Sequence, residues 1–282
     1  DQSTYYTSDF AHKVTSSSYG TSLLNTLHEL MYDSHGTYNT YNDLWDYTKY
    51  TDYDIDNPDN IILVYSRQSI DGTATASSWN REHVWCKSLS GGLYTSVSGT
   101  TSNAGTDIHH LRPASTAYNS TRGNTPYGVV ATHNSSTQLG DTDCYYTSSV
   151  FEPADYIKGD VARILMYMYT HYSNEVSGTS KKSGALSITN IVNTSAGTSQ
   201  AAWDLLMDWN ELDPVDYSEM IRNNQACVYT GNFNPFIDHP EYARMIWDDT
   251  SSYKAGLSFT TSYKPVNVGS SYTNTAPAVG NV

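Results

Sequence analysis

The sequence predicts an α+β fold, with helices toward both ends of the chain and a few strands between them. Apolar residues recur at helical spacing before residue 35 and after residue 157, and short apolar runs typical of strands lie in the middle. A chain of 282 residues can bury a full core, and no internal repeat is evident. We therefore predict a single domain over 1–282, with an N-terminal arm (1–20), a catalytic fold (about 20–250) and a loosely structured C-terminal tail (about 251–282).

The first half of the chain predicts one helix, one buried strand and a long loop. Ser22 is the expected N-cap of a helix with leucines and Met31 on one face. The turn 57–60 precedes the apolar run Ile61–Tyr65, which reads as a buried strand. The loop 89–106 is rich in Ser, Gly and Thr, and its length is typical of functional or mobile segments.

The second half is predicted to be mainly helical. Pro113 is placed to start a short helix over Ala114–Ser120. Apolar residues at helical spacing predict longer helices over 158–172 and 199–212. The Asp213-Pro214 pair ends the latter and opens another helix toward Gln225, and a short helix follows Pro240 as far as Trp247.

The charge is strongly acidic overall but not around one motif. The net charge of −14 predicts weak non-specific affinity for nucleic acid, because such binding usually depends on Lys and Arg. Between Arg81 and Asn124, however, four cationic residues oppose Glu82 and Asp107, which leaves a local charge of four minus two, or +2. An acidic protein can therefore still hold one cationic cleft, and catalysis on a phosphate substrate is not excluded.

The composition is typical of an exported protein. The chain is rich in Ser, Thr, Asn and Tyr, begins at Asp1 rather than Met, and has no apolar run of about 18 residues. We expect a secreted protein, extracellular or periplasmic, that is monomeric and does not insert into a membrane. Cys86, Cys144 and Cys227 allow at most one disulfide, and three independent buried thiols are the favoured interpretation.

The motif Trp79-Asn80-Arg81-Glu82-His83-Val84-Trp85 provides a candidate general base. Hydrolysis of a phosphodiester requires a water that loses its proton near neutral pH, and imidazole has a suitable ordinary pKa. His83 is therefore the predicted base. A histidine that is merely hydrogen-bonded in a strand is the alternative.

Oxygen ligands for a hard cation lie nearby. Mg²⁺ prefers oxygen ligands and often takes only one or two protein groups, so Glu82 and the side-chain oxygen of Asn119 form a minimal set. Neighbouring side chains on a strand point to opposite faces, however, so Glu82 and His83 reach one site only if the backbone turns or the metal bridges from the side. Asn119 alone could equally be a helix cap or surface amide.

The second motif, Asp107-Ile108-His109-His110-Leu111-Arg112-Pro113, adds further candidates. The spacing of His109 and His110 does not favour a zinc site, and one of them is expected to orient His83 or touch substrate. Arg112 and Arg122 offer forks that match phosphate oxygens and can offset transition-state charge.

These motifs resemble the bacterial endonuclease I family of secreted or periplasmic nucleases over roughly residues 20–250. The resemblance continues through Asn119, Arg122-Gly123-Asn124, Phe151-Glu152-Pro153, Lys158–Arg163, Asp213-Pro214-Val215 and Asn234–Pro240. It implies a ββα-metal (His-Me finger) core embedded in helices, with His83 as the base and a single divalent ion on Glu82 and Asn119. That ion is usually Mg²⁺, with Mn²⁺ or Ca²⁺ as alternatives. The family usually has proline where this chain has Cys86.

We therefore predict a metal-dependent endonuclease that cleaves DNA, and also RNA, with little sequence preference. The expected catalytic residues are His83, Arg112 and Arg122, and Glu82 and Asn119 are the metal ligands. Arg81, His109, His110 and Asn124 are expected to bind substrate. The alternatives are a phosphoesterase that prefers RNA or small diesters, and a non-catalytic surface-binding protein with the same fold.

Overall fold

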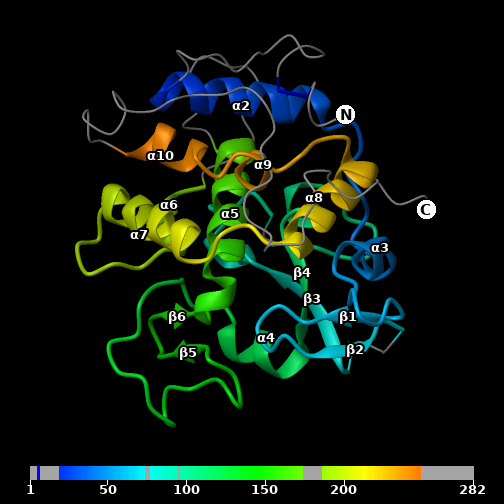
Figure 1. Cartoon of the computed structure of the whole chain (residues 1–282), viewed down its shortest axis with the longest axis vertical. Helices are drawn as coiled ribbons and strands as arrows, with labels where there is room; N and C mark the ends of the chain where they lie inside the picture. The colour runs from blue at the N-terminus through cyan, green and yellow to red at the C-terminus, as the bar shows by residue number, and fades with distance from the viewer. Residues whose placement is uncertain (1–4, 7–18, 74–76, 95, 174–185, 249–282) are drawn as a thin grey trace.

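The computed structural model describes residues 5–6, 19–73, 77–94, 96–173 and 186–248 (Figure 1). The predicted C-terminal tail and nearly all of the predicted N-terminal arm lie outside the described residues. Helices and short sheets are both present, so the α+β class is confirmed. No helix among the described residues is long and apolar enough to cross a membrane.

The helix α5 (Asp155–Tyr172) forms the centre of the molecule (Figure 1). Every residue from Ile157 to Tyr172 is buried, as expected for a helix that is covered on all sides. It packs against α7 (Ser199–Leu212) and α2 (Gly20–Ser34). The main hydrophobic cluster therefore lies around a buried central helix.

Shorter helices complete this layer. The helix α3 (Leu44–Thr51) packs against α8 (Tyr217–Thr230), and α10 (Tyr242–Trp247) packs against α2 and α7. Of two single-turn helices, α6 (Ile188–Ile191) lies between α5 and α7 in the chain, and α9 (Pro235–Asp238) lies between α8 and α10. Asp216 and Glu219 close the start of α8 with a capping box.

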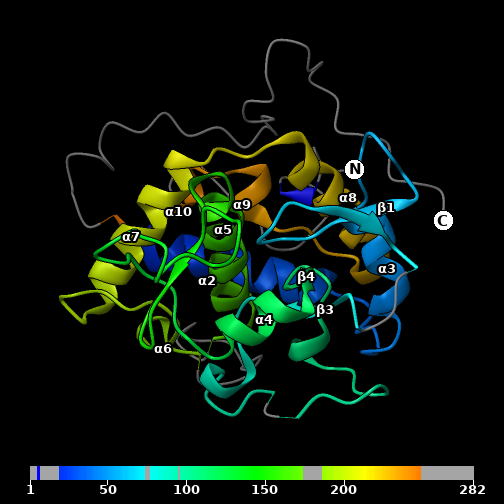
Figure 2. The ribbon, with the colours of Figure 1, turned by 90° about the horizontal axis from the view of Figure 1, so that it is seen from below.

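Three two-stranded antiparallel sheets occur in the described part of the chain. They pair β1 (Asn60–Ile62) with β2 (Ser69–Asp71), β3 (Trp79–His83) with β4 (Leu111–Ser115), and β5 (Tyr145–Tyr146) with β6 (Phe151–Glu152). In the middle sheet Trp79 lies opposite Ser115 and His83 opposite Leu111. The helix α4 (Thr116–Arg122) follows β4 directly and packs on both strands, so the chain forms two strands and a helix in succession (Figures 1 and 2).

Several predicted boundaries were wrong. The helix predicted to open at Asp213-Pro214 begins at Tyr217 instead and runs to Thr230. The first helix begins at Gly20 with Tyr19 as its N-cap, so Ser22 lies inside it. Pro113 lies in β4 opposite Arg81, because the pairing with β3 extends to Ser115 and delays the helix to Thr116. The predicted strand over 61–65 ends at residue 62, because the chain turns where the Arg67 amide donates to the Leu63 carbonyl.

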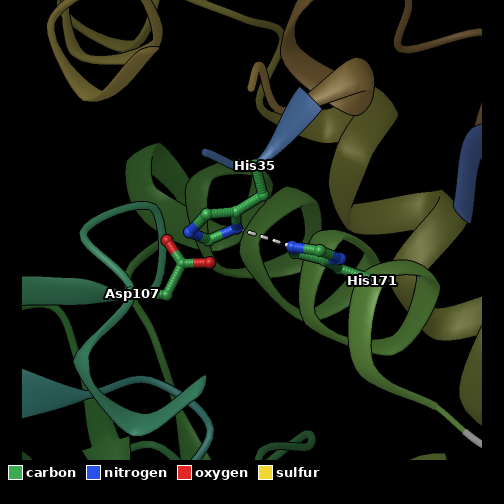
Figure 3. A group of neighbouring side chains, drawn as sticks. All are labelled: His35, Asp107 and His171. Atoms are coloured by element: carbon green, nitrogen blue, oxygen red, sulfur yellow. Dashed lines mark hydrogen bonds between the residues drawn. The ribbon is translucent and has the colours of Figure 1, made fainter. Parts of the chain in front are cut away.

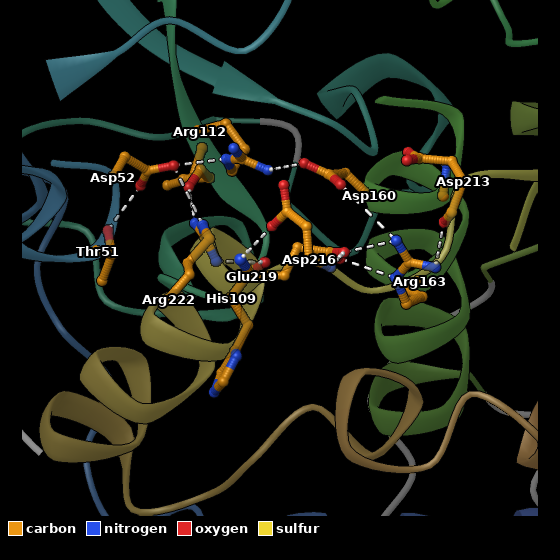
Figure 4. A network of polar contacts seen from close by, with 12 residues as sticks. Thr51, Asp52, His109, Arg112, Asp160, Arg163, Asp213, Asp216, Glu219 and Arg222 are labelled. Atoms are coloured by element: carbon orange, nitrogen blue, oxygen red, sulfur yellow. Dashed lines mark hydrogen bonds and ion pairs between the residues drawn. The ribbon is translucent and has the colours of Figure 1, made fainter. Parts of the chain in front are cut away.

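A buried ion pair ties α5 to α8, and a hydrogen bond ties α5 to the segment that follows α7 (Figure 4). Nε and Nη2 of Arg163 donate to the two carboxylate oxygens of Glu219, at 2.8 and 2.5 Å, and Nη1 donates to the Asp213 carbonyl at 2.9 Å. A side chain at Gly159 would collide with that carbonyl, because a Cβ there would lie 1.9 Å from it. The network therefore fixes how closely these segments approach.

Substituting Arg163 with methionine is expected to lower the free energy of unfolding by about 3–5 kcal/mol, since it leaves the Glu219 carboxylate buried without its partner. Arg244→Met is the matched control. Arg244 pairs with Glu211 at the surface, where an ion pair contributes only about 0–1 kcal/mol. Urea denaturation of both variants gives the comparison, and equal losses would contradict a special role for the buried network.

Candidate active site

Strand β3 and helix α4 line a cleft of about 320 Å³. Six of the nine predicted site residues lie in its wall: Arg81, Glu82, His83, Asn119, Arg122 and Asn124. The other lining residues are Tyr41, Asn80, Cys86, Lys87, Ser120 and Gly123. His109, His110 and Arg112 are not among them.

His83 ends β3 and has one nitrogen fixed by the backbone. Its Nε2 lies 2.9 Å from the carbonyl oxygen of Gly105. Because a carbonyl only accepts, Nε2 carries the hydrogen and Nδ1 keeps the lone pair. Burial, with smaller contributions from His110 and Lys87, holds the pKa of His83 well below its ordinary value. The imidazole is therefore neutral at pH 7 with Nδ1 as its basic nitrogen.

Glu82 is a buried carboxylate with one oxygen already engaged. The Tyr65 hydroxyl donates to Oε1 at 2.7 Å, and Nη1 of Arg122 lies 3.3 Å from the same oxygen. Burial raises the pKa of Glu82, while the positive charge of Arg122 opposes that rise. Among the described residues no hydrogen bond engages Oε2, which is the oxygen left for a cation.

Asn119 offers a second oxygen from α4. Its Nδ2 donates to Oδ1 of Asn80 at 2.5 Å, which turns Oδ1 of Asn119 away from that contact. Asn80 and Glu82 lie two residues apart on β3 and so share a face of the strand. This explains how the amide of Asn119 and the carboxylate of Glu82 come to line the same cleft.

The adjacent residues Glu82 and His83 both line the cleft, although neighbours on a strand point apart. Strand β3 ends at His83 and the backbone bends at Val84 and Trp85. This bend lies beyond both residues, and Glu82 and His83 themselves belong to the paired strand opposite Arg112 and Leu111, so the predicted turn does not lie between them.

Arg122 is fully buried beneath these residues. Its Nη1 donates to the His83 carbonyl at 3.2 Å and its Nη2 to the Val84 carbonyl at 2.9 Å. The same guanidinium pairs with Glu82 and lies 4.6 Å from the ring centroid of Tyr127. These contacts hold the backbone bend and the carboxylate together, so in this structure Arg122 positions other site residues.

The three predicted site residues outside the cleft have interior partners. Nε2 of His110 accepts the Trp85 amide at 2.8 Å, which fixes the backbone just beyond His83. Nε2 of His109 lies 3.0 Å from the Asn232 carbonyl. Arg112 donates to Asp52 at 2.6 Å and to Asp160 at 3.2 Å within the buried network (Figure 4). These contacts give no support to the predicted role of Arg112 in phosphate binding.

Arg81 and Lys87 supply positive charge to the wall of the cleft. The Arg81 guanidinium stacks on Tyr41 at 3.4 Å from the ring centroid and lies 4.1 Å from that of Trp45, and it donates to the Tyr41 carbonyl. The sequence reasoning missed Asn80, Lys87, Tyr41 and Tyr65 as site residues. Asn80 could have been predicted, because it lies two residues from Glu82 and so shares its face of the strand. No local sequence signal distinguishes Tyr41 and Tyr65 from the other tyrosines.

All three cysteines are free, as the favoured interpretation of the sequence expected. Cys86 and Cys144 are buried and Cys227 is partly buried. Cys86 also lines the cleft next to the bend that follows His83. A thiol therefore occupies the position where the resembling family usually has proline.

Comparisons with known proteins identify the family of the chain. The sequence model of the endonuclease I family, described as Endonuclease I, matches residues 18–241. An extracellular ribonuclease of Bacillus subtilis (strain 168) is 37% identical over 238 residues, which cover 81% of this chain and 75% of the relative. An extracellular ribonuclease of Bacillus amyloliquefaciens is 38% identical over 255 residues, covering 88% and 79%.

A more distant relative, Endonuclease-1 of Buchnera aphidicola subsp. Baizongia pistaciae (strain Bp), is 26% identical over 134 residues, which cover 47% of this chain and 46% of the relative. The family match spans nearly the whole region in which the sequence motifs occur, and it includes β3, β4 and α4. The chain therefore belongs to the endonuclease I family and is a nuclease, a hydrolase of ester bonds.

Proposed function

We propose that this nuclease is a secreted, metal-dependent endonuclease that cleaves RNA and DNA with little sequence preference, and that β3, β4 and α4 form a ββα-metal core. The observation that carries the proposal is the convergence of a base nitrogen, Nδ1 of His83, with two available oxygens, on Glu82 and Asn119, in one cleft. The names of the two Bacillus relatives, extracellular ribonucleases, support RNA as a substrate and secretion.

The donor set fits a hard divalent cation. Glu82 and Asn119 offer a carboxylate and an amide oxygen, and Mg²⁺ prefers oxygen ligands while keeping several waters. Mn²⁺ and Ca²⁺ also accept such ligands. A cation bound there would supply a positive charge that stabilises the charge developing on the phosphate and on the leaving oxygen.

His83 activates the attacking water. Nδ1 accepts a proton as the water oxygen attacks phosphorus, and the bond from phosphorus to the leaving oxygen breaks. The Gly105 carbonyl keeps the ring oriented, because Nε2–H donates to it before and after the transfer. The low pKa of His83 keeps the base in its neutral, active form at neutral and weakly acidic pH.

The contacts of the remaining predicted residues separate those that face the cleft from those that position other groups. We propose that Arg81, Lys87 and Asn124 contact substrate phosphates in the cleft. Arg122 acts through Glu82 and through the backbone of His83. His110 positions the backbone at Trp85, and His109 and Arg112 bind interior groups outside the cleft. Since the whole chain carries −14, we expect weak binding outside the cleft and strong inhibition by salt.

Glu82→Gln and Asn119→Ala should each raise the Mg²⁺ concentration needed for half-maximal rate by at least about 10-fold, since each removes one of two protein ligands. Cleavage of plasmid DNA and of single-stranded RNA is measured against Mg²⁺ concentration. Glu211→Gln, a surface carboxylate outside the cleft, is the control. An unchanged Mg²⁺ dependence in both cleft variants would refute the assignment of the ligands.

The same assay separates the alternatives. An enzyme that prefers RNA or small diesters would cleave single-stranded RNA or a chromogenic diester but leave plasmid intact. The proposal requires cleavage of both RNA and plasmid that stops when EDTA is added.

A further inference from the structure

Two histidines and an aspartate meet outside the candidate active site, where the ends of two helices approach the loop that leads into β4 (Figure 3). His35 follows the last residue of α2, His171 lies in the last turn of α5, and Asp107 follows a short 3-10 helix (Ala104–Thr106). One ligand atom of each side chain lies within 4.8 Å of the others. None of the three lines the active-site cleft.

We propose that His35, Asp107 and His171 bind a zinc ion that is separate from the catalytic cation. Two imidazole nitrogens and one carboxylate oxygen form a donor set that Zn²⁺ accepts, whereas Mg²⁺ favours oxygen alone. Three protein ligands leave one position for water in a tetrahedral site. His35 is only partly buried and precedes three exposed residues, so the ion can enter from solvent on that side.

Hydrogen bonds from neighbouring groups orient the Asp107 carboxylate and leave a lone pair on Nδ1 of His35, as metal binding requires. The hydroxyls of Tyr167 and Tyr172 each donate to Oδ2 of Asp107 at 2.7 Å, and the His109 amide donates to Oδ1 at 2.9 Å. Nε2 of His35 lies 3.0 Å from the Thr37 carbonyl, which fixes its hydrogen there and leaves the lone pair on Nδ1. Partners of this kind orient and tune metal ligands in zinc proteins.

Zinc would replace a hydrogen that already lies between the two rings. Nδ1 of His35 and Nε2 of His171 are 2.8 Å apart, and the lone pair on His35 makes His171 the donor. On binding, the hydrogen of His171 moves to its Nδ1 and the ion takes both lone pairs. Bonds of roughly 2.0–2.2 Å put tetrahedral ligands about 3.3–3.5 Å apart. The two histidine nitrogens, now 2.8 Å apart, would have to separate slightly, and the Asp107 oxygen, now within 4.8 Å of both, would have to take up the same spacing.

The local charge also favours a cation. Asp107 is negatively charged. The helices α2 and α5 both end at the cluster, and the C-terminus of a helix carries a partial negative charge. A zinc ion here would join both helices to the loop before β4, the strand that pairs with Glu82 and His83. All three cysteines are free, so no disulfide provides such a link. The expected role is therefore structural support of the catalytic strands.

The test uses the full chain, stripped with EDTA and then titrated with Zn²⁺ by calorimetry, with Co²⁺ as a spectroscopic probe. We expect tight binding of zinc, a visible absorption band typical of four- or five-coordinate cobalt, and a thermal midpoint raised by several degrees. In His35→Ala and in His35→Gln the affinity should fall by at least about 10- to 100-fold and the cobalt band should weaken. The second variant retains a polar group at the edge of helix α2 in case the first folds poorly.

Two controls locate the ion. His133→Ala removes a half-exposed histidine outside the cluster and should leave zinc binding unchanged. Glu82→Gln should also retain this site, because Glu82 belongs to the catalytic cleft. Equal zinc affinity in the wild type and both His35 variants would overturn the proposal, as would a zinc site lost only in Glu82→Gln.

Discussion

Replacing His83 with alanine is expected to lower the turnover number for RNA and plasmid cleavage by about 10²- to 10⁴-fold, the usual contribution of a positioned general base. The fold should survive, because within the described part of the chain the side chain makes a single hydrogen bond, to the Gly105 carbonyl. Single-turnover cleavage at saturating Mg²⁺ measures the chemical step, and circular dichroism confirms the fold.

A matched control and a rescue experiment strengthen this test. His133→Ala removes a histidine that pairs with Glu152 outside the cleft, and its cleavage rate should stay within about twofold of the wild type. Added imidazole should partly restore the His83→Ala variant, because a small base can enter the space left by the ring. Wild-type rates in His83→Ala would require another base.

The fold was predictable where local signals and burial agree. The helix over 199–212 was predicted correctly. Its apolar stripe identifies the buried face, and the following Asp213-Pro214 identifies its C-terminus. The boundary at Pro113 was wrong because long-range pairing with β3 overrides the local preference of proline for a helix start. The local sequence pattern carries no information on which strands pair. That β4 extends to Ser115 is therefore seen only in the structure.

The site was predictable where several chemical groups lie close together in the sequence. Arg81, Glu82 and His83 occupy one strand, and Asn119, Arg122 and Asn124 follow β4, so two short segments supply six lining residues. Tyr65 and Gly105 contact Glu82 and His83 from other parts of the chain. A buried arginine that holds a carboxylate, such as Arg122, cannot be told from a phosphate-binding arginine without knowledge of its burial.

Acid is expected to unfold the metal-free protein in a range set by buried histidines. Burial lowers the pKa of His109 to about 4 and that of His110 to about 3, although the charge of Asp107 opposes both shifts. In the unfolded chain both residues have a pKa of about 6.5. Below that pH the unfolded state takes up protons that the folded state refuses, so the free energy of unfolding falls as the pH decreases.

Together, the two histidines make the free energy of unfolding fall by up to about 2.7 kcal/mol for each unit of pH between roughly pH 6 and 4. Above pH 7.5 they contribute little to its pH dependence. The total loss of several kcal/mol is comparable with the whole stability of a typical domain, about 5–15 kcal/mol. Urea denaturation in EDTA at a series of pH values measures it, since EDTA removes the separate pH dependence of bound metals.

A variant separates this effect from general acid denaturation. His110→Gln retains an acceptor for the Trp85 amide but cannot take up a proton, so the slope should fall by up to about 1.4 kcal/mol per pH unit, the share of one histidine. His133→Gln, at an exposed histidine, should leave the slope unchanged.

A free energy of unfolding that stays level from pH 7 to 4 in the wild type would mean that His109 and His110 are readily protonated in the folded protein. The partners of His109 and His110 would then have to rearrange, because Nε2 of His110 has no lone pair for the Trp85 amide once both ring nitrogens carry hydrogen.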